Sequence, residues 1–277
     1  MPELPEVESI RRSLEILVPG QKIEGIELIW PGAVEGWKEK SFGDLVLGRT
    51  IETIGRKGKY LLIGLDEGIT VVGHMRMTGR LLYYPCHGKD EQTFGRHTHV
   101  VLKLSLGELH FNDQRKFGRL SVVPTDSLSL YPPLAKLGPE PMDKDLDGST
   151  LEHKLRNRKV SLKAALLDQT VVAGLGNIYA DEVMFEAGIE PERLVCHLGS
   201  TEMERLCQSM RNVIEAAIEA KGTTFRDYRD AYGGSGAFQN RLKVYGRAGK
   251  PCVQCGTPLL KMRLAGRTTV WCPHCQK

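Results

Sequence analysis

The first half of the chain alternates short apolar runs with turn-forming residues. Near the start, Val7, Ile10, Leu14 and Leu17 recur at the spacing of one face of a helix. Apolar and β-branched runs follow at residues 22–30, 60–65, 69–74, 99–105 and 119–123. Several short strands at this spacing predict a β-sandwich or barrel behind an N-terminal helix.

The pattern changes after residue 123. Residues 124–148 contain five prolines and predict a linker between domains. Residues 149–241 follow as a helical region, with apolar residues at helical spacing through 162–167, 178–185 and 203–218. Within it, the glycine-rich segment 222–240 predicts a long mobile loop of the kind that often serves as a lid. Together with residues 1–123 this makes an α+β protein.

The last segment, residues 242–277, contains four of the seven cysteines. Cys252 and Cys255 are separated by two residues, as are Cys272 and Cys275, and sixteen residues lie between the pairs. This spacing is typical of two knuckles that complete a tetrahedral zinc shell, with two disulfides as the alternative. Because the protein fills all four positions, the predicted zinc is structural. The intervening residues predict strand, turn and strand, with Arg267 at the tip of the hairpin.

Composition indicates a globular chain with one basic end. With 277 residues and 41% hydrophobic residues, the chain can bury a sizeable core, and we expect two domains. Residues 221–277 hold 11 Lys/Arg and two acids, which leaves 27 basic and 32 acidic residues elsewhere. A segment of net charge +9 beside a body of −5 favours a surface for a polyanion, although a solvated basic face is the alternative. No signal peptide or membrane span is evident, so we expect a soluble cytosolic protein.

The N-terminus offers candidate chemistry. If Met1 is removed, Pro2 presents a secondary amine beside Glu3, and such an amine forms iminium adducts with sugar aldehydes. An ordinary α-amine, with a pKa near ~8, is neutral roughly 300-fold more often at pH 7 than a lysine with a pKa near ~10.4. The alternative is a simple helix start, for which Pro5 is well suited.

Further candidates lie beside the predicted strand ends and helices. Met77 follows His74, and Phe117 follows Arg115, so bulky apolar residues near arginines are placed to wedge into a base stack. On their own, Met77 and Phe117 are more typical of core residues. Two other candidates have equally ordinary alternatives: Lys59 as a solvated edge lysine, and Asn177 in a glycine-containing turn between helices.

Taken together, these motifs resemble the formamidopyrimidine-DNA glycosylase family, bacterial base-excision enzymes for oxidised purines. The resemblance covers essentially the whole chain. It rests on the Pro-Glu-Leu-Pro-Glu-Val-Glu opening, Lys-Tyr-Leu-Leu, His-x-x-Met, Arg-Lys-Phe-Gly, Leu-Gly-Pro-Glu-Pro, Gly-Asn-Ile-Tyr, Val-Tyr-Gly-Arg and the four-cysteine hairpin. It implies an N-terminal helix with a β-sandwich, a helical domain with a helix-two-turn-helix, and a C-terminal zinc β-hairpin. The related endonuclease VIII branch typically has glycine where this chain has Leu4.

The resemblance also implies roles for individual residues. Pro2 attacks the anomeric carbon of the damaged nucleotide and Glu3 is the acid/base. Lys59 assists β-elimination, and Arg267 supports δ-elimination and phosphate binding. Three residues fill the void left by the flipped base: Met77, Arg115 and Phe117. The contacts to phosphate or DNA are His74, His97, Lys159, Asn177 and Tyr245. Residues 222–240 correspond to the loop that closes over the lesion.

The expected activity is therefore a bifunctional glycosylase and AP lyase that excises 8-oxoguanine and formamidopyrimidines. One structural Zn²⁺ per chain is the expected cofactor, and damaged double-stranded DNA the expected partner. We expect a monomer in the bacterial cytoplasm, associated with the nucleoid through DNA and not with a membrane. Two alternatives remain: an endonuclease VIII-type enzyme for oxidised pyrimidines, and a zinc-dependent DNA-binding protein without catalysis.

Overall fold

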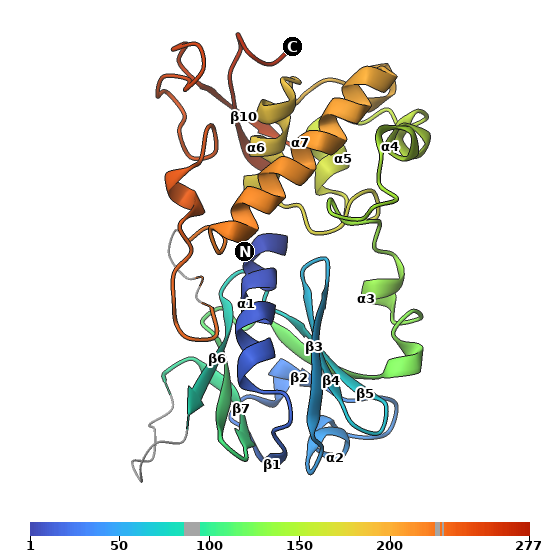
Figure 1. Ribbon diagram of the computed structural model, residues 1–277, viewed down its shortest axis with the longest axis vertical. Helices are drawn as coiled ribbons and strands as arrows, with labels where there is room; N and C mark the ends of the chain where they lie inside the picture. The colour runs from blue at the N-terminus through green and yellow to red at the C-terminus, as the bar shows by residue number, and fades with distance from the viewer. Residues whose placement is uncertain (86–94, 225–227, 229) are drawn as a thin grey trace. The chain divides into compact units, whose positions relative to one another are not determined.

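The computed structural model describes all residues of the chain except 86–94, 225–227 and 229 (Figure 1). It divides into two compact units. The first contains Met1–Ala135 and Ala220–Ala237, and the second Lys136–Glu219 and Phe238–Lys277. Most of the segment predicted as a loop of the helical region thus groups with the β-rich first unit. The predicted domain limits at residues 123, 148 and 241 stay predictions.

The first unit is built from one long helix and two sheets. Helix α1 spans Leu4–Leu17. The four-stranded sheet has the order β1 (Ile23–Leu28), β7 (Thr98–Leu104), β8 (Gly107–Asp113), β6 (Gly79–Pro85). The five-stranded sheet has the order β2 (Val34–Glu35), β9 (Arg119–Pro124), β5 (Ile69–His74), β4 (Tyr60–Leu65), β3 (Ile51–Lys57). Neighbouring strands are antiparallel except for β2 and β9. The predicted β-sandwich is confirmed.

Helix α1 closes the core of this unit. Its residues Val7, Ile10 and Leu14 are buried in one cluster with Leu61 of β4 and Phe111 of β8. In Figure 1 the helix runs beside strands of both sheets, and it contacts β3, β4 and β6. Burying an apolar side chain of this size contributes about 1.5–3 kcal/mol, so several along one face hold the helix firmly. The residues just before α1 are thereby anchored.

The second unit is helical and ends in a hairpin. Its helices are α4 (Gly148–Leu155), α5 (Leu162–Leu167), α6 (Asn177–Ala187) and α7 (Ser200–Glu219). The hairpin consists of β10 (Leu260–Leu264) and β11 (Arg267–Trp271). Helix α7 packs on α4 and α6, and α6 also contacts β11. The helices predicted at 162–167, 178–185 and 203–218 are confirmed.

Short elements complete the chain. They are α2 (Phe42–Val46), α3 (Pro132–Ala135) and the 3-10 turns Pro31–Ala33, Thr125–Ser127, Val195–His197 and Phe238–Asn240. Among the described residues, none of the helices combines the length and apolar composition that crossing a membrane requires.

An ion pair lies at the centre of the second unit. Lys163 of α5 and Asp181 of α6 have fully buried side chains, with Nζ 2.5 Å from Oδ1. Lys163 also donates to the carbonyl of Asn177 at 3.2 Å, and Asp181 Oδ2 accepts the N–H of Val270 at 3.1 Å. Two helices and the hairpin therefore share one charged centre. Burial raises the pKa of Asp181 to about 6, against the lowering effect of Lys163, so the carboxylate is charged at pH 7.

Replacing Lys163 with methionine is expected to destabilise the protein by about 3–5 kcal/mol, because it leaves the Asp181 carboxylate buried without its countercharge. The measurement is the free energy of unfolding from denaturant titration. The double variant Lys163→Met/Asp181→Asn removes both charges and keeps an acceptor for the Val270 N–H, so it should recover most of the loss. Equal stability of the parent and the single variant would contradict this account.

Candidate functional site

The N-terminal residues are held in place by a carboxylate. Pro2 is buried and Glu3 is 3% exposed, directly before α1. The N–H of Glu3 donates to Glu6 Oε2 at 2.8 Å, and the N–H of Thr223 donates to Glu6 Oε1 at 2.6 Å. Glu6 therefore fixes both the backbone at Glu3 and the start of the 220–237 segment.

Glu6 was not predicted as a site residue. The signal that could have found it is the three-residue spacing from Glu3, which is that of a capping box at the start of a helix. The bond from the Thr223 N–H to Glu6 depends on Gly222, which has φ +78°. A Cβ added at this glycine would lie 2.7 Å from Glu6 Oε1. A side chain at position 222 would thus displace the carboxylate.

Lys59 lies in the two-residue turn that joins β3 to β4, after Gly58 at φ +56°. It is only 6% exposed, so its interpretation as a solvated edge lysine is wrong. Arg56 connects this turn to α1, because its guanidinium donates to the Gly58 carbonyl at 3.0 Å and to Glu8 Oε2 at 3.1 Å. The lysine turn and the helix that begins after Glu3 are therefore joined by a charged pair.

Glu8 is the centre of that connection. Burial alone would raise the pKa of Glu8, but hydrogen bonds from Arg11, Arg12 and Arg56 hold it below its usual value. A carboxylate with three guanidinium partners stays charged at neutral pH. The attachment of α1 to the lysine turn is thus electrostatic as well as apolar.

His74 ends strand β5 as a neutral imidazole. Its Nδ1 accepts the N–H of Arg76 at 3.0 Å, and its ring meets the ring of Tyr60 edge-on at 4.5 Å. Burial, followed by the positive charges of Arg76 and Lys59, lowers the pKa of His74 from 6.5 to about 3. Since Nδ1 accepts a hydrogen bond, the proton of the neutral ring lies on Nε2, which is left as a donor.

Two loops of the first unit expose large apolar side chains beside an arginine. Met77 is 43% exposed and Phe117 is 51% exposed, so the interpretation of either as a core residue is wrong. The guanidinium of Arg115 lies 4.8 Å from the centre of the Phe117 ring, in cation–π contact. His97 is half-buried just before β7, and its carbonyl accepts the N–H of Asp113 at 2.9 Å.

In the second unit, Asn177 is the first residue of α6. Its side-chain amide donates to the carbonyl of Thr268 in β11 at 3.0 Å, so the helix start and the hairpin are hydrogen-bonded. Lys159 is exposed between α4 and α5. Both predicted phosphate contacts therefore lie at helix starts or in the connections between helices, where backbone amides also favour anions.

Tyr245 is positioned by a residue that the sequence did not indicate. Glu182 of α6 is 2% exposed, and its carboxylate accepts the N–H groups of Lys243, Val244 and Tyr245 at 2.8–2.9 Å. Burial raises the pKa of Glu182, against the lowering effect of these bonds. The sequence signal was the acidic pair Asp181 and Glu182, directly before the apolar residues Val183, Met184 and Phe185 of α6.

The hairpin places Arg267 beside its turn. Leu264 of β10 pairs with Arg267 of β11, so the turn consists of Ala265 and Gly266 alone, with φ of 49° and 70°. Two positive φ values are those of a tight hairpin turn. Arg267 is therefore the first residue of β11 and exposed, rather than part of the turn as predicted.

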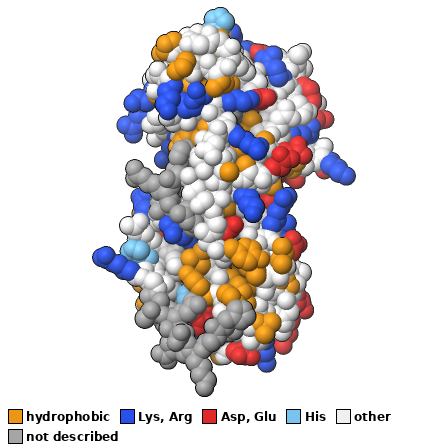
Figure 2. Space-filling model, turned by 60° about the vertical axis from the view of Figure 1, so that its left-hand side comes forward, with side chains coloured by type: hydrophobic (Ala, Val, Ile, Leu, Met, Phe, Trp, Pro, Cys, Tyr) orange, Lys and Arg blue, Asp and Glu red, His pale blue; other side chains and the backbone are white. Residues whose placement is uncertain are grey.

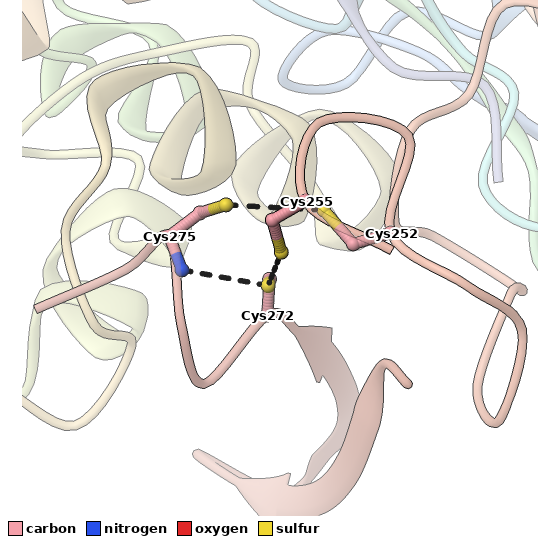
Figure 3. Close-up of side chains that lie close together, drawn as sticks. All are labelled: Cys252, Cys255, Cys272 and Cys275. Carbon is pink, nitrogen blue, oxygen red and sulfur yellow. Dashed lines mark hydrogen bonds between the residues drawn. The ribbon is translucent and has the colours of Figure 1, made fainter. Parts of the chain in front are cut away.

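The four cysteine side chains point toward one another (Figure 3). Their sulfur atoms all lie within 4.8 Å, with 3.9 Å between Cys252 and Cys275 and 3.5 Å between Cys255 and Cys272. A tetrahedral zinc with Zn–S bonds of about 2.3 Å requires S–S separations of about 3.8 Å. A disulfide requires about 2.05 Å, so the separations fit a metal and exclude the disulfide alternative.

Backbone amides orient two of these sulfurs. The N–H of Gln254 donates to Cys252 Sγ at 3.4 Å, and the N–H of Cys275 donates to Cys272 Sγ at 3.4 Å. Such bonds orient the sulfur and offset its negative charge, as contacts beyond the ligand shell generally do in metal sites. The donor set consists of four soft thiolates, which is typical of structural zinc.

The predicted residues thus fall into two groups. The first unit carries Pro2, Glu3, Lys59, His74, Met77, His97, Arg115 and Phe117, and the second carries Lys159, Asn177, Tyr245, Arg267 and the four cysteines. Part of the predicted lesion loop, residues 225–227 and 229, lies outside the described residues.

Comparison with known proteins gives matches along the whole chain. Residues 1–120 match the formamidopyrimidine-DNA glycosylase N-terminal domain, residues 137–229 the H2TH domain of that protein, and residues 249–277 the zinc finger found in FPG and IleRS. A formamidopyrimidine-DNA glycosylase from Desulfitobacterium hafniense is 54% identical, with 100% of both chains covered. One from Pelotomaculum thermopropionicum is 46% identical, with 100% of this chain and 99% of the relative covered.

Solved structures give the same result. A variant of the Lactococcus lactis FPG bound to DNA containing Fapy-dG has a TM-score of 0.90 and 38% identity, with 100% of both chains covered. The wild-type protein from that organism, bound to DNA with an oxidised pyrimidine, has a TM-score of 0.89 and 38% identity, also with 100% of both chains covered.

The depressed pKa of His74 predicts a dependence of stability on pH. Between pH 3 and 6.5 the unfolded chain binds a proton at this histidine that the folded chain does not, so stability falls as pH falls through this range. From pH 7 to pH 5 the contribution is about 2 kcal/mol. His74→Asn keeps an acceptor for the Arg76 N–H, does not titrate, and should therefore lose correspondingly less stability.

The measurement is the free energy of unfolding of both proteins at pH 7 and pH 5. His153→Asn, at an exposed position of α4, is the matched control and should behave as the parent does. Identical pH dependence of the parent and His74→Asn would contradict the buried neutral state.

Proposed function

The chain belongs to the formamidopyrimidine-DNA glycosylase family, and on this premise we propose that it excises oxidised purines from duplex DNA as a bifunctional glycosylase and AP lyase. The substrates that we propose are 8-oxoguanine and formamidopyrimidines. The observation that carries the proposal is the Pro2–Glu3 pair, buried before α1 and hydrogen-bonded through the backbone to Glu6. A reactive amine needs this kind of rigid placement to meet one carbon of a substrate.

The chemistry begins once Met1 is removed, because only then is the Pro2 nitrogen an amine. The nitrogen attacks C1′ of the damaged nucleotide, the glycosidic bond breaks, and its electron pair leaves with the base, which Glu3 protonates. The nitrogen then loses its proton, and its electron pair breaks the C1′–O4′ bond while O4′ takes up a proton, so that the sugar opens to an iminium at C1′. This cation makes a C2′ proton acidic, so that the 3′-phosphate leaves by β-elimination and the 5′-phosphate by a subsequent δ-elimination. We assign assistance in these eliminations to Lys59 and Arg267.

The nucleotide must leave the base stack before this attack, at a cost of a few kcal/mol. The exposure of Met77, and of Phe117 in contact with Arg115, supports their proposed role as the wedge that fills the vacated space. We propose that Arg115 pairs with the orphaned base. His74 can donate through Nε2–H to a phosphate as a neutral group, so its contact adds directionality and no counterion release.

We assign backbone contacts in the second unit to Lys159, Asn177, Tyr245 and Arg267, and a further DNA contact in the first to His97. Lys and Arg side chains gather on the surface of the second unit (upper part of Figure 2). Positive charge of this kind supplies most of the affinity of a protein for duplex DNA, independently of sequence. We propose that the protein acts as a monomer on chromosomal DNA in the bacterial cytoplasm.

We propose one structural zinc ion, held by Cys252, Cys255, Cys272 and Cys275. When bound, it supplies the energy that orders the two knuckles and thereby the base of the hairpin. The ordered hairpin would hold Arg267 at the start of β11. With four protein ligands, the zinc would have no open position for an attacking water.

Oxidised pyrimidines are the second candidate substrate class, because the Lactococcus lactis relative has been captured on DNA with such a lesion. In a DNA-binding protein without catalysis, the Pro2–Glu3 pair would serve only as the start of α1, and no covalent adduct with DNA would form. Excision rates measured in parallel on duplexes that contain 8-oxoguanine or thymine glycol distinguish the two hypotheses about the substrate class.

The first test uses protein with a native N-terminus and borohydride. With an 8-oxoguanine·cytosine duplex, reduction of the iminium should give a covalent adduct that mass spectrometry places on Pro2. Pro2→Gly should abolish base release while DNA binding persists, and Glu3→Gln should lower the excision rate by about 10²–10⁴-fold, the usual contribution of a general acid. The matched control Pro5→Ala keeps the amine and should still form the adduct. Unchanged excision by both site variants would remove the proposed chemistry.

The second test concerns the metal. The purified protein should contain about one zinc per chain by elemental analysis, and Cys272→Ser should lose metal and DNA binding together. Cys196→Ser changes a thiol outside the cluster and should retain both. Full DNA affinity in a protein shown to be free of zinc would refute the role of the hairpin.

A further inference from the structure

The two loops that carry Met77, Arg115 and Phe117 share one buried carboxylate. Asp113 is the last residue of β8 and is 1% exposed. Its Oδ2 accepts the N–H groups of Phe117 and Gly118, both at 2.7 Å. Its Oδ1 accepts the N–H of Arg115 at 3.1 Å. One carboxylate thus sets the course of the backbone through the whole Arg115 loop.

Thr78 connects the second loop to the same carboxylate. It directly follows Met77, and its hydroxyl donates to Asp113 Oδ1 and accepts the N–H of Arg115 at 3.2 Å. The strands below the loops are in register, since Gly79 of β6 pairs with Asp113 of β8. The Met77 and Arg115 loops are therefore linked twice, through the sheet and through the Thr78 hydroxyl.

The backbone of both loops is held in a costly shape. Arg76 and Lys116, which precede Met77 and Phe117, have φ of 52° and 59°. Side chains other than glycine rarely adopt this left-handed conformation, and the surrounding structure must impose it. In the Arg115 loop, the bonds to Asp113 and Thr78 impose this shape. In the Met77 loop, the Arg76 N–H donates to His74 Nδ1 and the Gly79 N–H donates to the Met75 carbonyl.

We propose that Thr78 and Asp113 are positioning residues that make Met77, Arg115 and Phe117 a single preorganised insertion head. The inference rests on the proposed function and deepens it. A wedge that enters a base stack must keep its shape against the stacking forces. If the loops were mobile before binding, ordering them and their side chains on the DNA would reduce the net binding free energy. The hydrogen bonds of Thr78 and Asp113, called here the Thr78–Asp113 bracket, order the loops before DNA binds and so avoid this cost.

This role predicts an effect on extrusion of the base and not on the chemistry at Pro2. An intact 8-oxoguanine must be unstacked and unpaired, whereas an abasic site has no base to move. Loss of the bracket should therefore slow the release of a damaged base much more than it slows strand cleavage at a preformed abasic site.

The test compares Thr78→Val with Thr78→Ser, because replacement of Asp113 endangers folding. Valine keeps the shape of threonine and removes the hydroxyl; serine keeps the hydroxyl. Thr78→Val should lower single-turnover release of 8-oxoguanine by about 10-fold, the effect of one hydrogen bond to a charged group. A 2-aminopurine next to the lesion should report equally slowed unstacking. Cleavage at an abasic site should stay close to the parent rate, and Thr78→Ser should restore base release.

Three results would overturn the inference: parent-like release by Thr78→Val, an equal loss on both substrates, or a serine variant as impaired as the valine variant. The first shows that the hydroxyl is dispensable, the second that the defect is general, and the third that the methyl group matters instead. Failure of the proposed function is seen separately, since the parent protein would then release no 8-oxoguanine.

Discussion

Buried backbone N–H groups need acceptors, and in this chain buried carboxylates supply them at the places where candidate site residues are held. Glu6 accepts from Glu3 and Thr223. Asp113 accepts from the loop that carries Arg115 and Phe117. In the second unit, Glu182 serves the segment with Tyr245, and Asp181 serves β11. Each of these carboxylates lies on a helix or at the end of a strand. The N–H groups that donate to them lie in loops, in a strand or in the N-terminal segment.

The choice of a carboxylate has an energetic reason. Its two oxygens accept several bonds at once, and charge-assisted bonds are about twice as strong as neutral ones. The desolvation of the charge is offset only while all these bonds are present, so loss of one partner costs more than the bond itself. A loop held in this way is rigid without a hydrophobic core of its own, and it can leave its working side chains exposed to a ligand.

The sequence predicted the elements whose patterns are local. Strands at 60–65 and 69–74 and the helix at 162–167 have the predicted bounds, because uninterrupted apolar runs at strand or helix spacing determine them. Strands β3, β6 and β8 were not predicted, since sequences such as that of β8, Gly-Glu-Leu-His-Phe-Asn-Asp, mix polar residues into half-buried positions. Their stability comes from neighbouring strands, which no local window contains.

The candidate site divides along the same line. Pro2, Lys59 and the cysteines could be found from residue type, spacing and resemblance. The burial of Lys59, the neutral state of His74 and the exposure of Met77 could not, because each depends on what the fold brings against the side chain. The carboxylates were missed for a related reason. In sequence, Glu6 and Glu182 resemble ordinary helix residues. The spacing from Glu3 signals only a capping box at Glu6, and the tertiary structure alone supplies the N–H groups of Thr223 and Tyr245.

The two steps of the proposed reaction, extrusion of the base and attack by Pro2, make different demands on the protein. Attack by an amine requires one nitrogen at one carbon, which the burial of Pro2 and Glu3 against a helix start provides. Extrusion of a base requires a rigid body with an apolar and cationic tip, and in our proposal Asp113 and Thr78 build this body from two loops. The hairpin strands have five residues each, too short for independent stability. The cysteine cluster at their base, together with the bonds of Asp181 and Asn177 to β11, supplies the missing order. The N-terminal segment, the two loops and the hairpin are thus each held rigid by their own local contacts. No single hydrophobic core has to position all three.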